Sequence, residues 1–139
     1  MTGPLILDAE AVQALAGPAG QGHIEVRAAM RAAQRLGREV IVPTVILAEL
    51  YRGPQRSQFI DSCLSRETGI RTRDTDRPFA RLVGGVLSGA GVGSQFLADA
   101  HVVAAAVERA GGIILTGDPK DMNRLAAPYR TIVVASLAS

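Results

Sequence analysis

Short apolar runs alternate with helix-like segments along the whole chain, and this alternation constrains the fold more than any other feature. Four of these apolar runs have the length and composition of strands: 5–7, 40–42, 113–116 and 131–134. The segment 70–73 is a further candidate strand, although it contains Arg71 and Arg73. Runs that are apolar along their length are typical of parallel strands, because helices cover both faces of such a sheet. The alternation predicts an α/β, three-layer sandwich around a mostly parallel five-stranded sheet.

The segments between these runs carry ordinary helix signals. We expect helices over 9–15, 22–36, 45–52, 57–64, from Asp74 or Thr75 to about Leu87, 97–110 and 119–125. Thr44 is a suitable cap for the third helix, Gly53 and Pro54 mark its end, and the glycine-rich stretch 88–94 predicts a flexible connection. No repeat, linker or low-complexity segment divides the chain, which predicts one domain over residues 1–139.

Four acidic residues stand where apolar segments end or break: Asp8, Glu49, Asp99 and Asp118. A carboxylate at the edge of a hydrophobic core carries a desolvation cost unless its charge is compensated. Each acid has a simpler explanation, since three could cap helices and Glu49 could pair with Arg52. A shared hard cation, Mg²⁺ or Mn²⁺, would explain all four together, because such ions prefer carboxylate oxygens.

Composition narrows the function classes. Aromatic residues make up 4% of the chain and Trp is absent, so an aromatic platform cannot be the main mode of nucleic-acid binding. Fourteen of the fifteen basic residues are Arg, but the net charge of +2 is too small to indicate a nucleic-acid binder by itself. Cys63 stands alone, which excludes an intramolecular disulfide and a cysteine metal cluster. No run is long enough to span a membrane, so we expect a soluble, cytoplasmic protein.

Four ordered segments resemble one known family. They are Leu5-Ile6-Leu7-Asp8, Val45-Ile46-Leu47-Ala48-Glu49, Ala98-Asp99-Ala100-His101 and Leu115-Thr116-Gly117-Asp118-Pro119-Lys120-Asp121. In this order and rough spacing the chain resembles the PIN-domain nucleases, and more narrowly the VapC-type toxins of bacterial toxin–antitoxin pairs. The resemblance spans essentially the whole chain and implies the strand order 3-2-1-4-5.

The resemblance also implies a function and a site. Asp8, Glu49, Asp99 and Asp118 would form an acidic quartet that holds Mg²⁺ or Mn²⁺ and performs catalysis, and Asp121 could share or replace the role of Asp118. The activity would be metal-dependent endoribonuclease cleavage by a type II toxin, with a metal-activated water as nucleophile. A homodimer, a cognate antitoxin and an RNA substrate, tRNA or rRNA, would be its partners. Many relatives carry Ser or Thr after the first Asp, where Ala9 stands here.

Other residues are candidates for supporting roles. Thr116 could position Asp118. Arg52, Arg56 and Lys120 lie nearer the predicted acids in sequence than the other basic residues discussed, which makes them the better candidates for binding RNA phosphates at the site. Arg27, Arg31 and Arg35 repeat every four residues and form one basic helical column, either a solvated face or a phosphate-binding stripe. His101 lies two residues after Asp99, and at about 100° of rotation per helical residue it points away from that acid, which argues against a general base.

Three other functions remain open from the sequence. The first is an RNA-processing PIN nuclease without an antitoxin. The second is a phospho-receiver signalling domain, which also carries acids at strand ends with a Thr and a Lys nearby, although a receiver has no use for Glu49 in mid-helix. The third is a binding module without catalysis, which the four intact acids disfavour.

Overall fold

A computed structural model describes residues 3–138 of the chain. One five-stranded, fully parallel sheet forms its centre, in the order β3-β2-β1-β4-β5. The strands are β1 (Leu5–Leu7), β2 (Val40–Pro43), β3 (Ile70–Arg73), β4 (Gly112–Thr116) and β5 (Ile132–Ser136). The predicted fold class and strand order are therefore confirmed.

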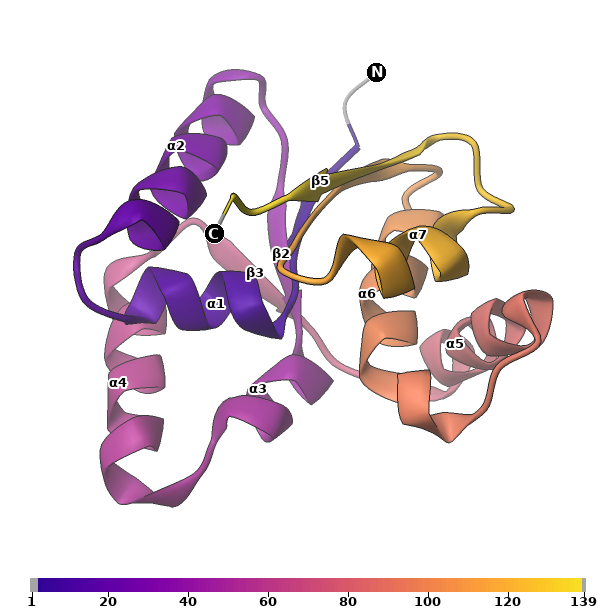
Figure 1. Ribbon diagram of the computed structural model, residues 1–139, viewed down its shortest axis with the longest axis horizontal. Coiled ribbons are helices and arrows are strands. Elements are labelled where there is room, and N and C mark those ends of the chain that lie inside the picture. Colours follow the sequence, from indigo (N-terminus) through magenta and orange to yellow (C-terminus); the bar gives the residue numbers. More distant parts are fainter. Residues whose placement is uncertain (1–2, 139) are drawn as a thin grey trace.

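Helices cover both faces of this sheet, as Figure 1 shows. They are α1 (Ala9–Ala16), α2 (Gln21–Arg35), α3 (Thr44–Leu50), α4 (Gly53–Arg66), α5 (Arg77–Ala90), α6 (Leu97–Val107) and α7 (Pro119–Ala126), with a 3-10 turn η1 (Ser94–Phe96) before α6. The helices α1, α2 and α4 pack together on one side, and α5, α6 and α7 on the other. The short helix α3 contacts both α1 and α6.

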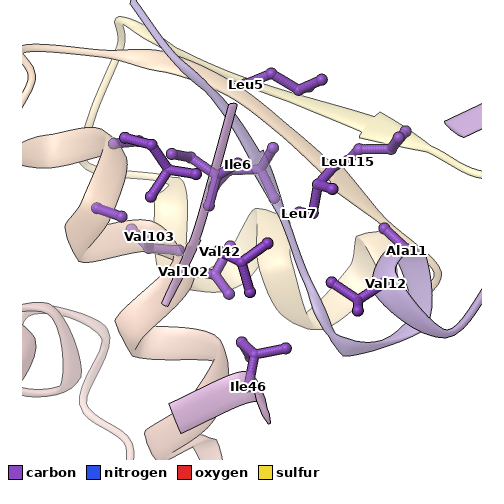
Figure 2. Close-up of a cluster of buried hydrophobic side chains, with 14 of the residues drawn as sticks. Leu5, Ile6, Leu7, Ala11, Val12, Val42, Ile46, Val102, Val103 and Leu115 are labelled. Carbon is purple, nitrogen blue, oxygen red and sulfur yellow. The ribbon is translucent and has the colours of Figure 1, made fainter. Parts of the chain in front are cut away.

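The hydrophobic core lies between the central strands and the helices next to them. Strand β1 is buried along its whole length between β2 and β4, with Ile6 paired to Ile41 and to Ile114. Helix α6 is buried over Ala100–Ala106, because Ala and Val leave room for close packing against the sheet. Figure 2 shows side chains from β1, α1, α3 and α6 meeting in this core. The core fixes the carboxyl ends of β1 and β4 side by side.

Two predicted boundaries around α3 and α4 are wrong. Gly53 and Pro54 do not close the third helix but begin α4, which extends well beyond the predicted 57–64. Pro is well suited to a first helical turn, where the N–H that it lacks has no intrahelical partner, and Gly53 takes the left-handed φ of 77° that the turn into α4 requires. Pro43, not Thr44, occupies the cap position of α3, and the Thr44 hydroxyl donates to the Arg73 carbonyl at 3.4 Å.

The start and end of α5 also differ from the prediction. Asp76, not Asp74 or Thr75, caps this helix by accepting from the Phe79 N–H at 2.9 Å. Arg73 stabilises the approach to this cap, because its guanidinium donates to the Asp74 carbonyl and binds Glu108 with two hydrogen bonds of 2.8 and 3.1 Å. The predicted flexible stretch 88–94 contains the last turn of α5.

Within the described residues, no single helix has the length and apolar character needed to cross a membrane. The pair formed by α5 and the segment Ser94–Val107, bent by 120°, meets those criteria by length and composition alone.

Candidate active site

Asp8 lies at the carboxyl end of the central strand β1 and is almost fully buried, with 3% of its surface exposed. It caps α1, because its Oδ1 accepts from the Ala11 N–H at 2.9 Å. Burial raises the pKa of this carboxyl, while hydrogen bonds from the Thr116 hydroxyl and from backbone N–H groups oppose that rise. The predicted capping role and a functional role are therefore compatible in one side chain.

The segment after β4 meets Asp8 from the neighbouring strand. The Gly117 N–H donates to Asp8 Oδ2 at 3.3 Å, and the buried Thr116 hydroxyl hydrogen-bonds the same carboxylate. Thr116 Oγ1 also accepts from the Asp118 N–H at 2.9 Å, so one hydroxyl connects the two acids. Asp118 in turn caps α7 by accepting from the Asp121 N–H at 3.4 Å. Thr116 thus has the positioning contact that the sequence suggested.

Asp99 lies in the first turn of α6 and is the point at which the acidic charges act together. Its pKa is raised to about 6, first by burial and then by the negative charges of Asp8, Glu49, Asp121 and Asp118. These residues come from the end of β1, from α3, from α7 and from the turn before α7, which are mostly far apart in sequence. The fold therefore brings the whole predicted quartet, and Asp121, within electrostatic reach of one carboxyl.

Two charged residues at this site were not predicted from the sequence. Glu10, in the first turn of α1, packs against Gly117, and its pKa is raised by burial and by the charges of Asp8 and Asp118. Arg124 in α7 lies 5.6 Å over the Phe96 ring, and its charge lowers the pKa of Asp121, which burial and Asp118 raise. The sequence shows Glu10 two residues after Asp8, but it does not show that the loop after β4 lies against Glu10.

The donor set fits a hard divalent cation in its chemistry. Several carboxylates lie near one another, and the negative charges of its neighbours make it harder for Asp99 to ionise. A bound cation would have the opposite effect, because it would favour the ionised form. The side chains are not gathered as in a finished coordination site, because no three His, Cys, Asp or Glu side chains among residues 3–138 stand close enough to hold an ion. Glu49 is exposed, whereas Asp8 is held by its hydrogen bonds and Asp118 by its cap on α7.

His101 is not at this site. Its side chain is buried, its Nδ1 donates to the Leu97 carbonyl at 2.7 Å, and its ring packs edge-on against Phe79 with centroids 5.7 Å apart. These contacts link α6 to α5 and give His101 a packing role between the two helices.

The predicted RNA-binding residues fall into separate places. Lys120 is exposed in the first turn of α7, where its charge lowers the pKa of Asp121. Arg52 donates to the Ala48 and Tyr51 carbonyls at the end of α3, at 2.7 and 2.9 Å. Arg56 is exposed on α4 and, with Phe59, lines a hollow of about 490 Å³ beside α1.

The basic column on α2 is only partly available for a ligand. Arg27 forms an ion pair with Glu67 at 2.7 Å, whereas Arg31 and Arg35 are exposed. Arg38, just beyond the helix, donates to the Gly3 carbonyl at 2.8 Å. The arrangement therefore favours a largely structural or solvated face.

No protein-family model matches the chain, and no curated protein sequence is significantly similar to it. Solved structures are similar in fold. A chain of VapBC2 from Rickettsia felis, bound to a DNA fragment from its promoter, superposes with a TM-score of 0.64 at 13% identity, covering 96% of this chain and 98% of that one. A chain of the DNA-bound VapBC from Salmonella typhimurium gives 0.63 at 16% identity, covering 99% and 100%. The fold that the resemblance implied is confirmed, because the chain has the PIN-like fold found in these VapBC complexes.

Proposed function

We propose that this chain is a Mg²⁺- or Mn²⁺-dependent endoribonuclease that acts as the toxin of a type II toxin–antitoxin system. The fold shared with chains of VapBC complexes over nearly the whole length supports the class of protein. The observation that carries the proposal is that the fold brings Asp8, Glu49, Asp118 and Asp121 near Asp99, whose pKa is raised first by burial and then by these four charges. Such a concentration of like charge is unfavourable without a cation and is typical of functional sites.

The chemistry follows from the acids and their supports. A divalent cation, when bound, would offset the negative charge, activate a water and stabilise charge that develops on the phosphodiester oxygens. Asp8, Glu49 and Asp99 would be its main ligands, with Asp118 or Asp121 completing the site. The Thr116 hydroxyl and the Gly117 N–H keep Asp8 fixed, which limits the reorganisation needed when the substrate arrives.

The same proposal includes partners. A cognate antitoxin would bind the toxin and a second copy would form a homodimer, while tRNA or rRNA would be the substrate. Large apolar side chains are exposed on the helices of one face, with Ile24 60% exposed on α2 and Phe59 57% exposed on α4. Exposed apolar side chains of this size are the kind of surface that a protein partner can bury.

The test is RNA cleavage by purified protein that is free of any partner. We expect cleavage in Mg²⁺ or Mn²⁺, none in chelator, and a loss of about 100-fold or more in Asp8→Asn and Asp99→Asn. Asp74→Asn is the matched control, because Asp74 is exposed and is not among the charges that act on Asp99. Cleavage that persists at full rate in chelator or in Asp99→Asn would contradict the metal mechanism.

An RNA-processing nuclease without an antitoxin has the same site and remains the second candidate. Finding whether an open reading frame for a small antitoxin-like protein lies directly upstream separates the two. The phospho-receiver alternative is disfavoured by the strand order β3-β2-β1-β4-β5, because receivers have the order 2-1-3-4-5.

A further inference from the structure

The carboxyl ends of β1 and β4, with Asp8, Asp99 and Asp118, form what we call the acidic edge. A hollow of about 600 Å³ lies beside it, and none of the roles described above involves this hollow. It is enclosed by α1, the loop into α2, the first turn of α2 and the last described residues of the chain. Figure 1 shows the segment after β5 running toward α1 and α2. The Ala138 N–H donates to Glu25 Oε2 at 3.0 Å, which holds this terminal segment against α2 and completes the wall.

One end of the hollow is in direct contact with the proposed catalytic site. Glu10 and Gly117 both line it. The Gly117 N–H donates to Asp8, and Glu10 is close enough to Asp8 and Asp118 to feel both charges. A nucleotide whose phosphate lies at the acidic edge would therefore have the hollow beside it.

The residues that line the hollow disfavour a phosphate and favour a neutral ligand with polar groups. None of the lining residues, all of which belong to the described part of the chain, is Lys or Arg, and the one charged side chain is the acid Glu10. Gln13, Gln21 and His23 contribute neutral donors and acceptors above an otherwise largely apolar surface of Ala, Gly, Pro and Leu. Planar bases that are unstacked from a single strand are recognised by this combination of apolar surface and hydrogen-bonding side chains.

His23 is positioned for such recognition by α1. Its Nδ1 lies 2.9 Å from the Leu15 carbonyl, which can only accept, so Nδ1 carries the hydrogen of that bond. The Nε2 atom is then left as an acceptor in the neutral ring. The side chain is thus held in one orientation by the last turn of α1, while Gln13 on the same helix is exposed and able to adapt.

We propose that this hollow binds the nucleobase of the nucleotide next to the scissile phosphate, and that Gln13, Gln21 and His23 set the base preference at that position. This inference rests on the proposed ribonuclease function and adds a specificity site to it. A segment of a partner protein is the other possible occupant, but the hollow is contiguous with the acidic edge and has amide and imidazole groups in its lining, which favour a base.

The variants Gln13→Ala, Gln21→Ala and His23→Asn test the assignment. The Asn amide can keep the hydrogen bond to the Leu15 carbonyl while removing Nε2. In His23→Gln the longer side chain instead places its amide near the position of Nε2 and loses the group that replaces Nδ1. Gln58→Ala is the matched control, since Gln58 is exposed on α4 and lines none of the hollows described. Melting curves of all five proteins identify any variant that fails to fold.

Cleavage of a pool of single-stranded oligoribonucleotides with randomised sequence gives the preference at each position around the cut. We expect the preference at one position beside the cut to fall by about 10- to 100-fold in the three variants and to persist in Gln58→Ala. The loss should be in kcat/KM for the preferred base, with other bases cut as before. An unchanged preference in all three variants overturns the inference and leaves the nuclease proposal standing.

A measurement without metal or cleavage separates the two proposals. The four nucleosides are titrated into metal-free Asp99→Asn protein while NMR follows the side-chain amides of Gln13 and Gln21 and the His23 ring. Saturable shifts for one nucleoside, lost in the His23→Asn double variant, support the hollow as a base site even if cleavage fails. If no nucleoside shifts these signals, the hollow is not a base site. If the variants lose binding of a partner protein but keep their RNA preference, the hollow binds that partner instead.

Discussion

The backbone N–H of Gly117 donates to Asp8 Oδ2 at 3.3 Å, joining residues 109 positions apart. This bond connects the ends of the neighbouring strands β1 and β4, which pair through Leu7 and Leu115. Glu10 closes over the same glycine from α1. The first acid of the site, the first turn of α1 and the loop that carries Asp118 therefore form one small unit.

Gly117→Ala tests how tightly this unit is packed. A Cβ at position 117 would overlap the Glu10 carboxylate and lie 2.9 Å from Glu10 Cβ. We expect Gly117→Ala to lower the free energy of unfolding by about 1–3 kcal/mol, the usual cost of overpacking, and to reduce cleavage. Adding Glu10→Ala should recover most of this stability, because it removes the obstructing side chain. Urea unfolding of the four proteins of the cycle measures the coupling, and strict additivity would contradict the packing argument.

Thr116→Val tests the hydroxyl that connects Asp8 with Asp118. Val has nearly the same shape but can neither donate to the Asp8 carboxylate nor accept from the Asp118 N–H. We expect cleavage to fall by about 10- to 100-fold, as for other groups that orient catalytic ligands, while Thr116→Ser stays near the wild-type rate. Thr72→Val, at an exposed position of β3, is the control. Equal rates for Thr116→Val and Thr116→Ser would show that the hydroxyl has no positioning role.

The raised pKa of Asp99 makes the stability of the metal-free protein depend on pH. Its pKa rises from 3.8 to about 6 on folding, so the folded state binds the extra proton more tightly than the unfolded chain. The stability that this difference contributes is complete below pH 3.8 and is lost as the pH rises through about 6. Asp99→Asn should abolish this decline and melt several degrees higher than wild type at pH 7.5. Melting temperatures from pH 3.5 to 8 measure it, and parallel curves for the two proteins would contradict the shift.

Most of the sheet could be predicted from the sequence because four of its five strands are largely apolar runs, which fit a buried parallel sheet, whereas β3 contains Arg71 and Arg73 and is only partly buried. Runs such as Leu5–Leu7 and Ile113–Thr116 have no polar face, so both of their faces must be covered. The acids at their carboxyl ends were likewise readable, since parallel strands bring those ends to one edge. Glu49 and Asp99 lie in helices, and the sequence set them apart only because each breaks or precedes an apolar segment. The family resemblance was needed to place them at the same site as the two acids at the strand ends.

Tertiary contacts decided the details that the sequence did not predict. Gly53 and Pro54 fit the end of one helix and the start of another equally well, and the turn after Tyr51 settled the choice. Asp74, Thr75 and Asp76 are all good caps, and the Arg73 network together with Pro78 selected Asp76. Glu10 joins the acidic site only because Gly117 comes to lie beside α1, a contact between segments more than a hundred residues apart.

Divalent cations should stabilise the folded protein through the same carboxylates. A ligand that binds only the folded state at 100 times its dissociation constant adds about 2.7 kcal/mol, so Mn²⁺ should raise the melting temperature in a concentration-dependent way. Asp8→Asn and Asp99→Asn should lose most of this rise, whereas Asp74→Asn should keep it.

The cation effect should also depend on pH, because a proton on Asp99 competes with the ion. With a pKa of about 6, Asp99 is mainly charged at pH 7.5 and mainly protonated at pH 5. The Mn²⁺-induced rise should therefore shrink between these two values in the wild type. If Mn²⁺ raised the melting temperature of wild type and of Asp99→Asn by the same amount at pH 7.5, the ion would bind elsewhere on the surface. The carboxylates of the acidic edge would then not be its ligands.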